Sequence, residues 1–280
     1  MKKIIGVALS ISMLISALPQ TAVWAADNKC GDNLTWNISN NGTLTINGTG
    51  DMYNYHPTGE APWYSASLNG DVKYIKISQG VESLSDYAFQ SSTELKEVMI
   101  STTVKQIGLN PFVSSNKLQG IYVVPGENPY YCSVGGVLFD KSKTKLVAYP
   151  IGKTENSYEI PGSVTTIQTG AFDSSTLTSI KIPKSVTKIE EYAFYAANDI
   201  TDIYYGGTAE DWNKINFDKA SNFGISSNNE KLTMHYTDTP KTVAVESISF
   251  NTDKLILTKG KSAVINVTFI PSNATNKSIT

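Results

Sequence analysis

The sequence has no arginine, only two histidines and only two cysteines among its 280 residues, and each shortage excludes a class of protein. All 23 basic residues are lysine, and the 25 acidic residues bring the formal net charge to −2. Nucleic-acid binding requires a basic surface and base recognition relies on arginine, so we expect no nucleic-acid partner. Two cysteines cannot build a disulfide-rich scaffold or a four-cysteine zinc site, and two histidines leave little for proton-transfer chemistry.

The first 25 residues have the pattern of a secretory signal peptide. Lys2 and Lys3 precede an uncharged apolar run over residues 4–18, and Val23 and Ala25 are the small residues of a cleavage site. A transmembrane anchor needs about 20 apolar residues, which neither this run nor any later one provides. We therefore predict signal-peptide residues 1–25, no transmembrane segment, and a secreted protein associated with the cell surface.

An internal repeat occupies residues 72–205. Each copy has an apolar residue at its first position and further apolar residues three and five positions later. Successive copies start 23 residues apart, except for one longer interval between two of them. The copies begin at Val72, Leu95, Leu118, Leu177 and Ile200, and the phenylalanines that close them are Phe89, Phe112, Phe172 and Phe194. Such a unit cannot bury its apolar face alone, whereas stacked units bury a continuous core. The predicted fold is a β-rich α/β solenoid with a parallel sheet face, and its phenylalanines pack as an inward spine.

The register of the repeat breaks between Val123 and Ile160. Residues 136–140 and 145–149 are two β-forming segments separated by a four-residue loop, which predicts a β-hairpin inserted near 136–149. We expect Tyr158-Glu159-Ile160 to restore the strand ladder.

Three of the repeat segments resemble the BspA-like leucine-rich repeats of bacterial surface proteins. They are Val104–Phe112, Ser163–Phe172 and Leu177–Val186. The resemblance covers about residues 72–205 and implies a leucine-rich repeat solenoid with a role in adhesion or protein binding. Leu109-Asn110-Pro111 departs from the small residues usual before the phenylalanine, and the cysteine often found after it is absent from every copy.

A solenoid needs caps over its terminal turns. Residues 26–71 form the predicted N-terminal β cap, with hairpin strands at 34–39 and 43–48 around Asn41-Gly42. Residues 206–236 form the predicted C-terminal cap, in which Thr208 begins a short helix.

The C-terminal segment predicts a separate module. Residues 237–242 have the composition of a linker, and residues 243–280 are similar to the start of a bacterial Ig-like domain of the intimin/invasin type. An Ig-like sandwich needs about seven strands. We therefore expect an incomplete domain and a chain that continues beyond residue 280.

No motif in the sequence predicts catalysis. His56 falls in the N-terminal cap and His235 in a closing strand, so a shared site is not expected. The run Asp140–Thr144 alternates oxygen-bearing residues but lacks the glycine and glutamate of a calcium loop, and the adjacent Glu190 and Glu191 predict a solvated turn. We expect no enzyme activity, no cofactor and no metal.

The two cysteines lie in different predicted modules. Cys30 belongs to the N-terminal cap and Cys132 to the irregular repeat. We expect two free thiols, while a disulfide between them remains the alternative for an exported protein.

The outward side chains of the predicted sheet are the candidate binding surface. Each strand exposes its third and fifth residues, Gly120 among them, and tyrosines and charged groups recur there; tyrosine is a favoured contact residue. The candidate binding residues are Tyr74, Lys76, Glu97, Met99, Tyr122, Glu159, Lys181, Asp202 and Tyr204.

The predicted function is that of a secreted or cell-surface binding and adhesion protein. The expected partner is a host or bacterial surface protein or glycan, and the expected state is a monomer. Two alternatives stay open. In the first, the chain is the targeting region of a larger extracellular hydrolase whose catalytic domain lies beyond residue 280. In the second, the chain is a structural spacer.

Overall fold

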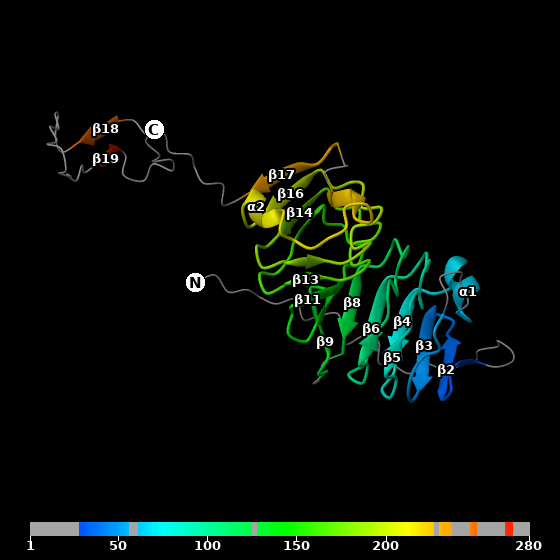
Figure 1. Cartoon of the computed structure of the whole chain (residues 1–280). Coiled ribbons are helices and arrows are strands. Elements are labelled where there is room, and N and C mark those ends of the chain that lie inside the picture. Colours follow the sequence, from blue (N-terminus) through cyan, green and yellow to red (C-terminus); the bar gives the residue numbers. More distant parts are fainter. Residues whose placement is uncertain are drawn as a thin grey trace, which may run out of the picture.

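The computed structural model describes residues 28–55, 61–124, 128–226, 230–236, 247–250 and 267–270. Its described residues form a β-solenoid that is mostly sheet with few helices (Figure 1). The predicted signal peptide, the predicted linker and His56 lie outside the described residues.

The first sheet contains six strands, which follow one another in space as β1-β2-β3-β4-β6-β8. They are β1 (Lys29–Gly31), β2 (Leu34–Ile38), β3 (Thr43–Gly48), β4 (Tyr74–Ile77), β6 (Glu97–Ile100) and β8 (Gly120–Val123). The pairs β1–β2 and β2–β3 are antiparallel, whereas β3, β4, β6 and β8 are parallel. The antiparallel strands at the N-terminus thus continue directly into the solenoid sheet, and Figure 1 shows the parallel strands side by side.

A second parallel sheet follows, and it is separate from the first. Its strands are β12 (Ser157–Glu159), β14 (Ser179–Ile182), β16 (Asp202–Tyr205) and β17 (Thr233–Tyr236). The strand ladder is restored at β12, but in a separate sheet, so the expectation of one parallel sheet face is wrong. The N–H groups on the far edge of β8 are already bonded, since Ile121 donates to the carbonyl of Gly136 and Val123 to the hydroxyl of Ser133, each at 2.8 Å.

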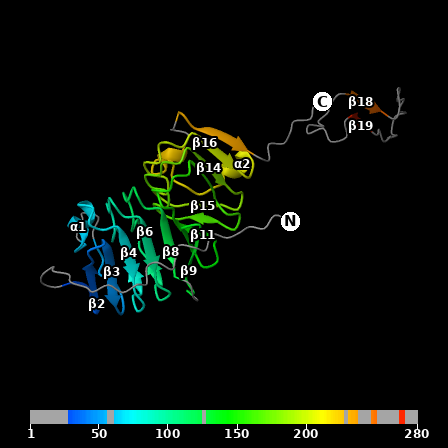
Figure 2. The same cartoon turned by 180° about the vertical axis from the view of Figure 1, so that it is seen from behind.

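The segment between the two sheets forms an antiparallel arrangement that joins a third sheet. β9 (Tyr131–Val134) pairs with β10 (Val137–Asp140), and β10 pairs with β11 (Lys145–Ala148). β11 then runs parallel to β13 (Thr166–Ile167), which is parallel to β15 (Lys188–Ile189), and Figure 2 shows β11 and β15 from behind. β5 (Ser83–Leu84) and β7 (Gln106–Ile107) form the matching ladder beside the first sheet. The hairpin near 136–149 is thus more than an insertion, because β11 supplies a regular short strand of the solenoid.

The apolar core is divided into two clusters by β10 and β11. Leu138 and Val147 belong to the N-terminal cluster, whereas Val137, Phe139 and Leu146 belong to the C-terminal one. Side chains alternate between the faces of a strand, so strands buried on both faces supply both clusters.

The repeated phenylalanines form two aromatic stacks instead of one spine. Phe89 and Phe112 stack with ring centroids 5.8 Å apart, and Phe172 and Phe194 stack at 4.8 Å. Trp63 extends the first stack and Tyr149 the second, at 5.5 and 5.1 Å. Tyr149 precedes Phe172 by one repeat length of 23 residues, so it takes the phenylalanine position of the irregular turn.

The remaining elements are short. α1 spans Tyr64–Leu68, α2 spans Ala209–Trp212, and a 3-10 helix spans Phe223–Ile225. The prediction that Thr208 begins a helix is confirmed, because its side chain accepts the N–H of Asp211 at 3.1 Å and caps α2. Farther on, β18 (Ser247–Phe250) and β19 (Val267–Ile270) pair antiparallel. In the part of the chain that is described, no helix is both long and apolar enough to cross a membrane.

Candidate binding face

The structure divides the nine candidate residues between the two parallel sheets. We call Tyr74, Lys76, Glu97, Met99 and Tyr122 the first face, and Glu159, Lys181, Asp202 and Tyr204 the second face. All nine side chains are partly or fully exposed, while the residues between them, such as Ile75 and Ile203, are buried. The break between β8 and β12 therefore separates two short faces where the sequence predicted one.

The first face is built from two rows of residues in register. Lys76, Met99 and Tyr122 lie side by side on β4, β6 and β8. The neighbouring row contains Tyr74, Glu97 and Gly120. Gly120 was expected to be exposed but is buried, because the ring of Tyr122 lies across it.

The second face carries a row of alternating chemistry. Glu159, Lys181 and Tyr204 are in register on β12, β14 and β16. The Lys181 ammonium lies 3.2 Å from the Glu159 carboxylate, and both side chains are largely exposed. An exposed ion pair of this kind contributes about 0–1 kcal/mol, so a partner can replace it at little cost.

His235 on β17 completes the second face, although the sequence did not connect it with the candidate residues. Its ring lies parallel to that of Tyr204 at a centroid distance of 4.4 Å, and its Nε2 lies 2.7 Å from Oδ1 of Asp202. Hydrogen bonds from His235 and from Thr201 hold the pKa of Asp202 below its ordinary value. The sequence signal that could have placed His235 on this face is the alternation of side chains around Met234, because Met234 pairs with Ile203 in the structure.

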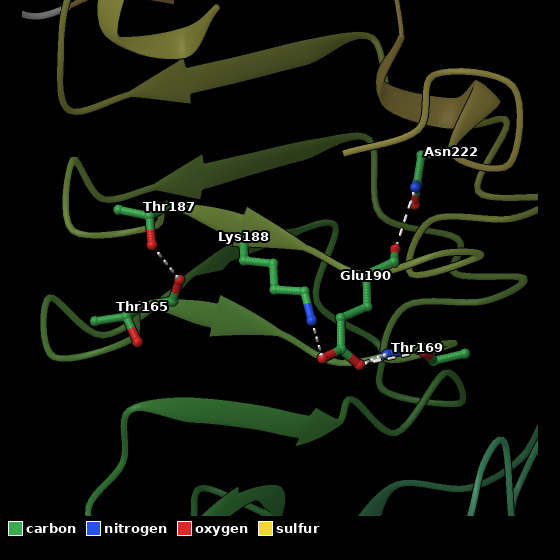
Figure 3. A network of polar contacts seen from close by, with 6 residues as sticks. All are labelled: Thr165, Thr169, Thr187, Lys188, Glu190 and Asn222. Carbon is green, nitrogen blue, oxygen red and sulfur yellow. Dashed lines mark hydrogen bonds and ion pairs between the residues drawn. The ribbon is translucent and has the colours of Figure 1, made fainter. Parts of the chain in front are cut away.

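The carboxylate of Glu190 has a structural role on the turns. Its Oε2 accepts the backbone N–H and the hydroxyl of Thr169 at 3.1 and 3.2 Å, and its Oε1 lies 3.0 Å from the Lys188 ammonium (Figure 3). Burial would raise the pKa of Glu190, but the hydrogen bonds from Lys188 and Thr169 outweigh it and lower the pKa. The expectation of a merely solvated turn is therefore wrong for Glu190, which ties neighbouring turns together.

Both cysteines are free thiols. Cys30 is buried in the N-terminal cluster, and burial raises its pKa to about 12, which leaves it protonated and unreactive. Cys132 is half-buried against the C-terminal cluster. The two therefore belong to different parts of the core.

The junction between the two halves contains one small pocket. Phe112, Ile121, Tyr149 and Asn110 are among its lining residues, and its volume of about 30 Å³ suits one or two water molecules. Among the described residues, no group of three or more histidine, cysteine, aspartate or glutamate side chains is placed to hold a metal ion. The exposed sheet faces are thus the strongest candidate for a functional surface.

Among solved structures, this chain is similar to several bacterial leucine-rich repeat proteins. A leucine-rich repeat protein from Eubacterium ventriosum is 19% identical, with a TM-score of 0.32 over 74% of this chain and 67% of the other. The pneumococcal vaccine antigen PcpA is 20% identical, with a TM-score of 0.38 over 50% of this chain and 52% of the other. A leucine rich cell surface protein from Faecalibacterium prausnitzii is 27% identical, with a TM-score of 0.34 over 68% of this chain and 42% of the other. At TM-scores below 0.5, these likenesses determine neither the shape nor the function of this chain. No curated protein sequence matches the chain.

The family described as BspA type leucine rich repeat region matches residues 65–131 and 152–258 in six copies. The second match extends into the segment that was predicted to be Ig-like, and no comparison supports an Ig-like domain there. The matched residues make up more than half of the sequence and contain all nine candidate residues. The chain belongs to the BspA type leucine-rich repeat family.

Proposed function

We propose that this chain is an extracellular bacterial binding protein that holds a surface protein or glycan against its two sheet faces. The observation that carries the proposal is the in-register arrangement of outward tyrosine, lysine and carboxylate side chains on both sheets. Repeated parallel strands fix these groups on a rigid backbone, so a partner meets them without a large ordering cost.

The predicted signal peptide and the family both support an extracellular location. Residues 1–25 have the pattern of an export signal. The leucine-rich repeats resemble those of bacterial surface proteins, which agrees with that location. The second face adds a mixed set of donors and acceptors, with Lys181, Asp202 and His235 within one patch.

The test is capture of a partner from host extracellular matrix, mucin or bacterial cell-wall material. One variant carries Tyr74→Ala, Lys76→Ala and Tyr122→Ala, and a second carries Lys181→Ala and Tyr204→Ala. The matched control carries Tyr192→Ala and Tyr195→Ala, which removes two exposed tyrosines from a turn outside both faces.

We expect capture by the parent chain and by the control variant, and at least a tenfold loss in one or both face variants. Unchanged capture by both face variants would exclude the sheet faces. A parent chain that retains nothing from any of the three materials would favour the spacer alternative.

A further inference from the structure

Tyr122 differs from Tyr204 in what lies under its ring. A methyl group placed on Gly120 would lie 2.5 Å from Cε2, Cζ and Oη of Tyr122, so the ring lies across the glycine backbone. A methyl group on Gly136 would lie 3.1 Å from the Cα of Gly120 and 3.5 Å from the Tyr122 hydroxyl. Two glycines thus form a floor beneath the ring, and Tyr122 is partly exposed.

The break in the solenoid produces this floor. Gly135 and Gly136 join β9 to β10 in a two-residue turn, and both have positive φ values of 57° and 81°. Such a turn favours glycine at both positions. The Gly136 carbonyl then accepts the N–H of Ile121 and brings the turn against β8. A regular next strand would have presented a side chain at this place.

A carboxylate stands beside the ring. Glu97 is the register partner of Gly120, so it lies one strand, about 4.8 Å, from the position that the ring covers. Burial raises the pKa of Tyr122, and the charge of Glu97 adds to this increase. Lys76 lies on the same face but two strands from Tyr122, at about 10 Å by strand spacing.

Tyr204 on the second face is the contrasting case. Its ring is stacked on His235 with an interplanar angle of 9°, so one side of that ring is already covered by an aromatic neighbour. Among the described residues, no aromatic ring contacts Tyr122. Unlike Tyr204, Tyr122 therefore has one side of its ring against glycine backbone and no aromatic neighbour stacked on it.

We propose that Tyr122 is a stacking platform for one neutral sugar unit of a glycan, and that the Glu97 carboxylate accepts hydrogen bonds from its hydroxyl groups. This inference rests on the proposed function and names the ligand class of the first face. The face of an aromatic ring is negative. The C–H bonds on one side of a pyranose are slightly positive, and a flat ring meets that side over its whole area.

The carboxylate restricts the class of sugar. Glu97 can accept hydrogen bonds from two neighbouring hydroxyls, which fixes the orientation of the sugar on the ring. Its negative charge opposes a sialic acid or uronic acid unit at the same place. The platform is accordingly suited to a hexose or an N-acetylhexosamine.

Saturation-transfer difference NMR on the whole chain tests the inference, with lactose, chitotetraose and 3′-sialyllactose as probes. Tyr122→Phe keeps the ring, and Tyr122→Ala removes it. Gly120→Ala keeps every functional side chain but places a methyl group where the ring lies, and the backbone of Gly120 has no positive φ that would strain alanine. Tyr192→Ala, at an exposed turn position outside both faces, is the control.

We expect transfer to at least one neutral probe, concentrated on the protons of one sugar face, and weaker transfer to 3′-sialyllactose. Binding should stay within about threefold in Tyr122→Phe and Tyr192→Ala, and fall at least tenfold in Tyr122→Ala and Gly120→Ala. If Gly120→Ala unfolds, the comparison of Tyr122→Phe with Tyr122→Ala decides.

The inference is overturned if neither neutral probe receives transfer, if Tyr122→Ala binds like the parent chain, or if 3′-sialyllactose binds best. These outcomes are distinct from failure of the proposed function. A chain that captures a protein through the second face but binds no sugar keeps the proposed function and loses this inference.

Discussion

The side-chain carbonyl of Asn222 accepts the backbone N–H of Phe194 at 2.9 Å and thereby ends a hydrogen-bond ladder. In the preceding turns, the N–H of Phe172 donates to the carbonyl of Ala193, and that of Phe89 donates to the carbonyl of Pro111. The last turn has no following turn to supply such a carbonyl. The buried Asn222 takes its place, and its Nδ2 donates to the carbonyl of Glu190 (Figure 3). The same Nδ2 donates to the carbonyl of Asp218.

Replacement of Asn222 by alanine should therefore destabilise the C-terminal half. The change leaves the buried Phe194 N–H without its acceptor and removes one donor to the Glu190 carbonyl, which should cost about 1–3 kcal/mol. Urea unfolding measures the loss, and Asn198→Ala, at an exposed turn position, is the matched control. Equal stabilities of the two variants would show that Asn222 does not terminate the ladder.

The two aromatic stacks should respond separately to mutation. Phe172→Ala removes the centre of the C-terminal stack and should cost about 3–5 kcal/mol, as should Phe89→Ala in the N-terminal stack. In hydrogen exchange, Phe172→Ala should lower protection of β14 and β16 more than that of β4 and β6, and Phe89→Ala should do the reverse. An equal loss of hydrogen-exchange protection in both halves, in both variants, would mean that the two clusters behave as one core.

The regular part of this architecture could be predicted from the sequence, because a repeat places the same residue types in the same register. The expected positions of β4, β6, β8, β14 and β16 follow from the apolar residues spaced by three and two. The separation into two sheets could not be predicted, because it depends on hydrogen bonds that the edge of β8 donates to the Gly136 carbonyl and the Ser133 hydroxyl.

The second face was only partly predictable for a similar reason. Tyr204 and Asp202 follow from the repeat, but His235 is reached through an irregular segment and comes into register only through the pairing of β16 with β17. Asn222 was missed because a side chain that replaces a backbone carbonyl has no repeat pattern. Tyr149 was detectable, since its distance of 23 residues from Phe172 repeats the period.

In each repeat that ends in a phenylalanine, two residues near that phenylalanine have backbone φ angles in the left-handed region. Ala196, with a φ of 52°, is one of them. This conformation costs a residue with a side chain about 1–2 kcal/mol, and glycine avoids the cost. Ala196→Gly should therefore stabilise the chain by about 0.5–1 kcal/mol after the entropy of the unfolded glycine is counted.

Ala197→Gly is the control for that change. Ala197 is buried, and its φ is not in the left-handed region, so glycine there should destabilise the chain by about 1 kcal/mol. Thermal unfolding of the two variants gives the comparison. A lower unfolding temperature for Ala196→Gly than for the parent chain would contradict the inference that the backbone of Ala196 is strained.

Asp173 should make stability depend on pH in a defined direction. It is buried, and desolvation raises its pKa despite a hydrogen bond from Ser174. A raised pKa in the folded state favours folding below the unfolded pKa of about 3.9, and this contribution is lost as the pH rises through the folded value.

Asp173→Asn removes the buried charge and keeps the shape of the side chain. We expect this variant to be more stable than the parent at pH 7, with a difference that shrinks as the pH approaches 4. Urea unfolding across this range measures it, and Asp199→Asn at an exposed position is the control. A less stable variant at pH 7 would show that the charge of Asp173 is stabilising.

The proposed binding role is tested most directly by nitration of tyrosines with tetranitromethane, with and without a captured partner, followed by peptide mass spectrometry. Tyr204 is 41% exposed, and the turn tyrosines Tyr192 and Tyr195 are 47% and 53% exposed, so the chain carries its own controls. Protection of Tyr204 or of Tyr122, with Tyr192 and Tyr195 modified as before, is the predicted result. Protection of Tyr192 and Tyr195 with Tyr122 and Tyr204 unchanged would place the binding surface on the turns and contradict the account.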